Sequence, residues 1–166
     1  MDIDGNMALR LYKEAAEDGI AIGHFHQGYL HEFGIGASYN LSSAYKCYMR
    51  ATKSGYTNAK KGILRICEKV LLSNSPIGRW PSKSVFDYDW YCDIKDRAIA
   101  GEPEYQYLYG LSFEEGAVSN QSYEDAMAWY LRSCKAGISR SMIRLGRMYY
   151  SGIGVEKSYA IAKEYF

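Results

Sequence analysis

Glycines recur at a fixed spacing along this chain of 166 residues. Gly19 and Gly55 are 36 residues apart, as are Gly101 and Gly137, and the 46 residues from Gly55 to Gly101 equal that period plus ten. A period of about 20 to 50 residues is typical of repeat arrays. Each unit of such an array has too little core to be stable alone, so neighbouring units must stack.

Other residue types keep the same register. Nine residues after each of these glycines the chain has Gly28, Leu64, Gly110 and Gly146, and eleven residues before each it has Ala8, Ala44, Trp90 and Ala126, with Ala162 continuing the second series. Small residues let helix backbones approach closely. Larger side chains such as Tyr48 and Trp129 are expected to fill the space between helices.

Each unit is predicted to contain two helices joined by a short turn. The first helix, as over residues 139–151, ends at a glycine such as Gly152, which can take the left-handed conformation that stops a helix. The second begins at an N-cap such as Ser122, and Asp125 can complete a capping-box-like pair. With only three prolines in the chain, this pattern predicts an all-α fold.

The segment 145–155 reads Leu-Gly-Arg-Met-Tyr-Tyr-Ser-Gly-Ile-Gly-Val. It resembles the hallmark of Sel-one-like repeats (SLRs), Leu-Gly-x-x-Tyr-x-x-Gly-x-Gly-Val, at every fixed position. The resemblance extends over essentially the whole chain, although Leu64, Val70 and Leu72 replace glycines that the family has in the second unit. It implies a right-handed α/α superhelical solenoid of two-helix repeats, related to tetratricopeptide arrays.

The predicted array fills residues 1–166. It comprises a leading helix (1–18), repeat 1 (19–54), an irregular repeat 2 with a loop insertion near 73–82 (55–100), repeat 3 (101–136) and a partial repeat 4 (137–166).

Composition gives no sign of a membrane span or a nucleic-acid ligand. Twenty lysines and arginines balance nineteen acids, and no apolar stretch approaches the roughly 18 residues of a membrane helix. The N-terminus lacks the pattern of a signal peptide, which favours a cytoplasmic location over a periplasmic or secreted one. The four cysteines form no Cys-x-x-Cys pair and are expected to be free core thiols.

No catalytic or cofactor motif is found. His24 and His26 point about 200° apart on a helix, and His31 stands where other units have core residues, so no metal site is expected. Paired acids such as Glu114 and Glu115 are interpreted as solvated helix ends. The chain is therefore predicted to bind no cofactor and no small-molecule substrate, and not to be an enzyme.

Three arginines lie on one face of the first helix of repeat 4. Arg140, Arg144 and Arg147 follow i, i+4, i+7 spacing, and like charges so placed repel by roughly 0.2–0.5 kcal/mol per pair. This arrangement favours an outside counter-charge. Either a partner supplies it, or Glu104 and Glu115 of repeat 3 pair with the arginines across the groove.

Corresponding stripes in the other repeats are expected to face the same concave groove. The predicted partner-binding residues there are His26, Tyr29 and Phe33 in repeat 1, Arg65 and Lys69 in repeat 2, and Leu108 and Leu111 in repeat 3. Exposed aromatic residues suit binding anchors, although these could instead pack against the leading helix. In the insertion, Arg79 and Trp80 are candidate contacts, unless Trp80 folds back over a gap.

These features predict a non-catalytic scaffold or adaptor that holds another protein in its groove. The resemblance also admits a bacterial immunity protein that blocks a secreted toxin. Nucleic-acid binding is a third alternative, because arginines could contact phosphates and tyrosines could stack on bases, but the balanced charge disfavours it. The open C-terminal repeat could also support self-association. If the arginine stripe holds the partner, replacing Arg144 and Arg147 with glutamate should abolish binding and leave the fold intact.

Overall fold

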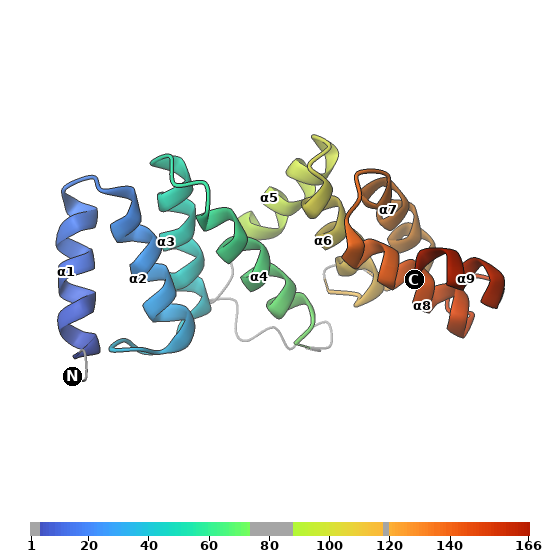
Figure 1. Ribbon diagram of the computed structural model, residues 1–166, viewed down its shortest axis with the longest axis horizontal. Helices are drawn as coiled ribbons and strands as arrows, with labels where there is room; N and C mark the ends of the chain where they lie inside the picture. The colour runs from blue at the N-terminus through green and yellow to red at the C-terminus, as the bar shows by residue number, and fades with distance from the viewer. Residues whose placement is uncertain (1–3, 74–87, 118–119) are drawn as a thin grey trace. The chain divides into compact units, whose positions relative to one another are not determined.

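The computed structural model describes residues 4–73, 88–117 and 120–166, and within these residues every regular element is an α-helix (Figure 1). In chain order they are α1 (Gly5–Glu17), α2 (Ala21–Phe33), α3 (Leu41–Lys53), α4 (Ala59–Leu71), α5 (Tyr88–Ile99), α6 (Pro103–Glu114), α7 (Tyr123–Lys135), α8 (Ser139–Ser151) and α9 (Tyr159–Tyr165). The predicted all-α repeat fold is confirmed. Arg79 and Trp80, in the predicted insertion, lie outside the described residues.

The chain divides into two compact units, Met1–Cys67 and Glu68–Phe166, with the boundary inside α4. In unit 1, α2 packs between α1 and α3. In unit 2, α6 packs between α5 and α7, and α8 packs between α7 and α9. Each unit therefore consists of helices that contact their sequence neighbours, as expected for stacked two-helix repeats.

The helix ends follow the local chemistry of the sequence. The side chain of Ser122 accepts a hydrogen bond from the backbone N–H of Asp125 at 3.2 Å, and the Ser122 hydroxyl also lies 2.6 Å from the Asp125 carboxylate. Gly152 ends α8 with φ of 72°, in the left-handed region. The predicted N-cap and glycine stop are both present, and they satisfy backbone groups that a helix end leaves unpaired.

One aromatic ring packs on one glycine in three of the repeats. A Cβ atom added to Gly28 or Gly110 would lie 2.8 or 2.9 Å from the ring of Tyr48 or Tyr130, respectively. Both rings are fully buried. In repeat 4 the same relation holds between Gly146 and Phe166, at 2.7 Å, but Phe166 is 70% exposed. Gly28 and Gly110 are thus required by the close approach of a buried ring.

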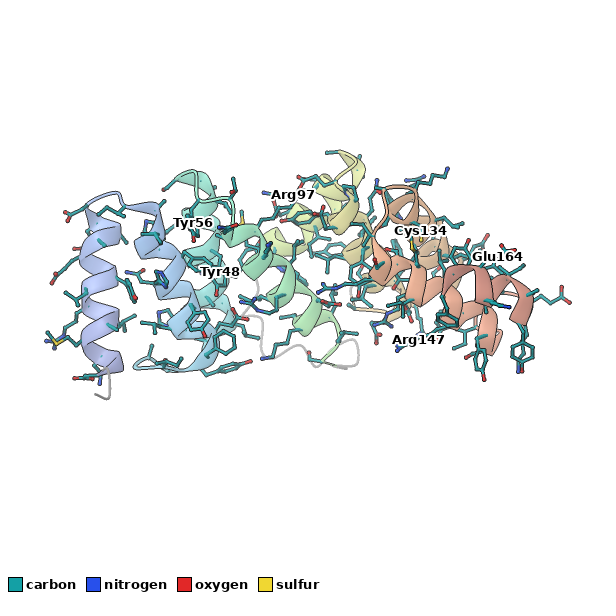
Figure 2. The ribbon with its side chains drawn as sticks, in the orientation of Figure 1. Tyr48, Tyr56, Arg97, Cys134, Arg147 and Glu164 are labelled. Carbon is teal, nitrogen blue, oxygen red and sulfur yellow. The ribbon has the colours of Figure 1, made fainter. Side chains whose placement is uncertain are left out.

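Repeat 2 lacks a glycine at position 64, but α4 has another glycine two residues earlier. A Cβ on Gly62 would lie 2.7 Å from the far edge of the Tyr48 ring. Tyr48 therefore lies between Gly28 of α2 and Gly62 of α4, and in Figure 2 it points from α3 toward α4. The irregular repeat retains a close helix contact by a different residue.

Candidate protein-binding site

A glutamate recurs thirteen residues after the first three phase glycines, near the end of the first helix of each repeat. These residues are Glu32, Glu68 and Glu114. Each accepts one hydrogen bond from a tyrosine hydroxyl and one or more from an arginine. In repeat 4 the same position holds Tyr150. The carboxylates are therefore part of the repeat architecture, and each is paired within its own unit.

In unit 1 this arrangement surrounds a buried carboxylate. Glu32 is 3% exposed, and the Tyr48 hydroxyl donates to it at 2.7 Å. Arg65 donates from two nitrogens, Nε and Nη2, to the two carboxylate oxygens, both at 2.6 Å. Such a two-point guanidinium–carboxylate contact compensates the loss of solvent around a buried charge. Arg65 and Glu32 thus tie α4 to α2.

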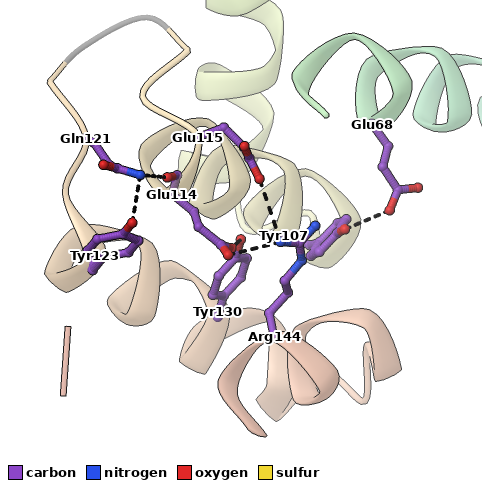
Figure 3. Close-up of polar contacts among 8 residues, drawn as sticks. All are labelled: Glu68, Tyr107, Glu114, Glu115, Gln121, Tyr123, Tyr130 and Arg144. Carbon is purple, nitrogen blue, oxygen red and sulfur yellow. Dashed lines mark hydrogen bonds and ion pairs between the residues drawn. The ribbon is translucent and has the colours of Figure 1, made fainter. Parts of the chain in front are cut away.

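Unit 2 holds the equivalent cluster in a denser form (Figure 3). The Tyr130 hydroxyl donates to Glu114, and Arg144 Nη1 lies 3.0 Å from Glu114 and 3.7 Å from Glu115. The side chains of Arg144, Glu114 and Glu115 are only 17%, 19% and 22% exposed. Burial, followed by the neighbouring Glu114, raises the pKa of the Glu115 carboxyl, and Arg144 partly offsets this. Arg144 is therefore the counter-charge of two adjacent acids.

Glu68 takes its partners from α6 and α8. Its Oε1 accepts from the Tyr107 hydroxyl at 2.7 Å, and its Oε2 accepts from Arg140 Nη1 at 2.6 Å. The Arg140 side chain stays 59% exposed, so this pair is partly solvated and contributes little to stability.

Three tyrosines bonded to these carboxylates should make the protein sensitive to alkali. Burial, and then the neighbouring glutamate, raises the pKa of Tyr48, Tyr107 and Tyr130 above the ordinary value of 10.0. The stabilisation from a raised pKa is fully present below the unfolded-state pKa and is lost as pH rises toward the folded-state pKa.

We therefore expect the free energy of unfolding, measured in urea, to fall above about pH 10. The variant Tyr48→Phe should be less stable at pH 7 but show a shallower fall between pH 9 and pH 11. An equal slope in the variant would contradict this account of Tyr48.

The predicted arginine stripe divides into paired and unpaired residues. Arg144 pairs with Glu115, one of the two acids named in the alternative without a partner, and also with Glu114. Arg140 pairs with Glu68, which that alternative did not include. Arg147 is exposed and makes no ion pair within the part of the chain that the structure describes (Figure 2). The interpretation of Glu114 and Glu115 as solvated helix ends is wrong, because Arg144 and Tyr130 enclose them.

Two predicted contact residues are buried. Leu108 and Leu111 are 1% and 0% exposed, so they belong to the core and present no surface to a partner. The physical reason is that α6 is apolar around most of its circumference and is buried along Tyr105–Ser112 except at Gln106. A helix with apolar residues on all sides has no exposed stripe.

The remaining predicted residues of the described chain lie in α2 and α4. Tyr29 and Phe33 are 41% and 50% exposed and lie against each other with ring centroids 4.6 Å apart. Phe33 also lies 5.8 Å below the guanidinium of Arg65. Lys69 is exposed. His26 is half-buried and stacks on Tyr12 of the leading helix at 4.6 Å, which leaves it little free surface.

One side of α8 is thus exposed, cationic and partly apolar. Its members follow i, i+3, i+7, i+10 spacing and share one side of the helix. We call them the α8 face: Arg140, Ile143, Arg147 and Tyr150. Ile143 is 44% and Tyr150 55% exposed. Neither Ile143 nor Tyr150 had been singled out from sequence, although their spacing from the predicted arginines is visible there.

Comparison with known proteins identifies the repeat. The family model described as Sel1 repeat matches residues 2–20, 22–56, 103–138 and 139–166. The chain belongs to the Sel1 repeat family. The unmatched stretch between residues 56 and 103 includes most of the repeat predicted to be irregular. Sel1 repeat proteins are generally protein-interaction scaffolds and are typically non-catalytic.

Solved structures and a curated relative are also similar to this chain. The Sel1 repeat protein from Oxalobacter formigenes matches 98% of the chain with a TM-score of 0.61 and 18% identity, and the chain covers 62% of that protein. The SLR-fold protective antigen c5321 from uropathogenic Escherichia coli matches with a TM-score of 0.42, 17% identity, and coverage of 98% of this chain and 48% of that one. Chitin synthase regulatory factor 3 of Schizosaccharomyces pombe is 36% identical over 80 residues, which are 48% of this chain and 8% of that protein.

Neither a membrane-spanning helix nor a metal-binding cluster is present in the described part of the chain. None of the helices in residues 4–73, 88–117 and 120–166 combines the length and apolarity needed to cross a membrane. Over the same residues, His, Cys, Asp and Glu side chains form no group of three or more placed to hold a metal ion. Cys47 and Cys67 are buried thiols, and Cys92 and Cys134 are half-buried thiols.

Proposed function

We propose that this Sel1 repeat chain is a non-catalytic scaffold for another protein, and that the α8 face binds an acidic segment of that partner. The observation that carries the proposal is the contrast among three arginines of α8. Arg144 and Arg140 each have a carboxylate within 3.0 Å, whereas Arg147 is exposed and has none within the described residues.

The repeat register explains why Arg147 has no carboxylate partner among the described residues. Arg147 lies ten residues after Gly137, as Arg65 lies ten residues after Gly55. In unit 1, Arg65 holds Glu32. In unit 2, Arg144 already holds Glu114, so the counterpart of Arg65 has no carboxylate to bind. An exposed arginine whose neighbouring arginines are already paired with carboxylates is a favourable place for a partner carboxylate to bind.

The apolar members of the α8 face give the surface a second kind of contact. Ile143 and Tyr150 flank Arg147 by one helical turn on either side. Binding interfaces combine apolar burial with a few directed polar contacts, and Tyr and Arg are frequent anchors. A partner segment with an apolar residue near a glutamate or aspartate therefore fits this surface.

Unit 1 offers a separate candidate surface made of Tyr29, Phe33 and Arg65. Its exposed ring pair, with the Arg65 guanidinium over Phe33, resembles an aromatic anchor beside a cation. The binding of one partner by both surfaces through a single concave groove stays a prediction.

The proposal is tested by affinity capture from a cell extract followed by mass spectrometry, with three versions of the chain. We expect wild type and Arg10→Glu to capture the same partner and Arg147→Glu to lose it. Arg10 is exposed on α1, so its variant carries the same charge change in unit 1. Equal capture by all three would contradict a role for the α8 face. The double replacement of Arg144 and Arg147 is not a clean test, because Arg144 stabilises Glu114 and Glu115.

The two alternative functions, toxin blocking and nucleic-acid binding, predict different experimental results. A toxin-blocking immunity role stays a prediction; it requires that the captured partner is a toxin and that co-expression of the chain restores growth. Nucleic-acid binding is disfavoured because Glu68, Glu114 and Glu115 neutralise two of the three arginines of α8. A single-stranded oligonucleotide that binds at low salt would revive it.

A further inference from the structure

A cavity of about 560 Å³ lies in unit 1, where α1, α2 and α3 stand side by side (Figure 1). Its polar lining comes from Lys13 of α1, from His24, Gln27 and His31 of α2, and from Arg50 of α3, with Glu17 at the same wall. His24, Gln27 and His31 share one side of α2 at i, i+3 and i+7. The volume is within the range of about 300–1,000 Å³ that small-molecule sites occupy.

Both imidazoles have an unusual feature. The Nδ1 atoms of His24 and His31 are buried and have no hydrogen-bond partner in the described part of the chain. A buried Nδ1 without a partner costs free energy whether it is a donor or an acceptor, so Nδ1 itself does not fix the position of the ring proton. Because Nδ1 is closed to solvent, Nε2 is the nitrogen that each ring can offer to the cavity, and an acceptor bound there would place the proton on Nε2.

The side-chain amide of Gln27 can also donate a hydrogen bond into the cavity. Its Oε1 accepts a hydrogen bond from the Cys47 thiol at 3.7 Å, which leaves the amide NH₂ group to serve the cavity that Gln27 lines. Burial raises the pKa of Cys47, so this thiol stays a protonated donor. Gln27 therefore adds a donor beside the two imidazoles.

The charges at the cavity are also uneven. Arg50 is exposed and forms no ion pair among residues 4–73, 88–117 and 120–166. Glu17 is held at 3.9 Å by Lys13, and both side chains are more than 60% exposed, at 66% and 71%, so the pair is weak. Within the described residues, Arg50 is thus a positive charge without a paired acid. The other polar groups that line the cavity, Glu17 excepted, can donate hydrogen bonds.

We propose that this cavity binds a small oxyanion, a carboxylate or phosphate group of a small molecule, through Arg50, Gln27 and the Nε2–H groups of His24 and His31. An acceptor ligand matches the charges of Arg50 and Lys13 and the amide NH₂ group of Gln27, and it would be bound by Nε2–H on the two imidazoles. The site is separate from the α8 face, which belongs to the other unit, so it does not depend on the proposed protein binding.

Nuclear magnetic resonance of the histidine rings tests the proposal, because the third histidine is an internal control. His26 stacks on Tyr12 and does not line the cavity. The full chain is titrated with inorganic phosphate, and separately with succinate, at constant pH and with ionic strength held constant by chloride. We expect saturable shifts of the His24 and His31 ring signals with at least one of the two anions, and little change at His26.

A matched pair of variants then tests the role of Arg50. Arg50→Gln should weaken the anion about tenfold, the loss of one charge-assisted hydrogen bond, while Arg10→Gln should bind as wild type does. Binding of phosphate alone or succinate alone would define the anion class. If neither anion shifts the signals, if all three histidines shift equally without saturation, or if both variants bind like wild type, the proposed site is overturned.

Discussion

Replacing Arg144 with glutamate is expected to lower the free energy of unfolding by about 4 kcal/mol, since breaking a buried ion pair leaves an uncompensated charge. The variant would place a third carboxylate beside Glu114 and Glu115, whose side chains are about one-fifth exposed at 19% and 22%. Among the described residues, it would also leave the Glu114 carboxylate with only the Tyr130 hydroxyl as a partner. Urea unfolding followed by circular dichroism measures the difference.

The neighbouring arginine provides the control for this prediction. Arg147→Glu makes the same charge change three residues later on the same helix, but Arg147 is exposed. We expect its stability to stay within about 0.5 kcal/mol of wild type, as is usual for surface substitutions. Equal losses in the two variants would mean that the stripe acts as one stabilising unit. The division into a structural Arg144 and an available Arg147 would then be wrong.

Gly110→Ala is the second change with a large expected effect. Alanine is favoured over glycine within a helix by about 1 kcal/mol, so propensity alone predicts a more stable protein. The new Cβ, however, would lie 2.9 Å from the Tyr130 ring and 3.1 Å from the backbone oxygen of Ala126. Because Glu114 fixes the hydroxyl end of that ring, the ring cannot move aside. We expect a net loss of about 2 kcal/mol from overpacking, measured by the same urea titration.

Gly146→Ala is the matched control for Gly110→Ala. Its Cβ would lie 2.7 Å from the Phe166 ring, which is closer than the contact at Gly110. Phe166 is 70% exposed and has no hydroxyl, so its ring can rotate away. We expect this variant to be as stable as wild type or more stable, by at most about 1 kcal/mol. A comparable loss at both glycines would contradict the role given to Glu114 in fixing Tyr130.

The helices were predictable from sequence because the signals that set them are local. Ser122 and Asp125 lie three residues apart, and Gly152 ends α8 by its own backbone conformation. The 36-residue register added the stacking of repeats, since it marks the small residues at which helix backbones approach closely. Gly62 is an exception: it serves a packing role in α4 at a position that the register does not mark.

The candidate site was predictable only in part, because its polar contacts join distant helices. Glu114 contacts Tyr130 and Arg144, which are 16 and 30 residues further along the chain. In the sequence, Glu114 and Glu115 form an adjacent pair of acids like those of a solvated helix end, so these contacts were not indicated. The recurrence of glutamate at the same position in three repeats was the available signal. Leu108 and Leu111 were misplaced because the stripe that is exposed in α8 is covered in α6, where apolar residues occupy nearly every side.

The most direct test of the protein-binding account is a footprint of the captured partner on the isotope-labelled chain. Backbone amide shifts are recorded with and without the partner at fixed pH and salt. The account predicts the largest changes within residues 140–150 of α8, and their loss in Arg147→Glu with Arg10→Glu unchanged. Changes confined to other helices, with α8 unaffected, would contradict it.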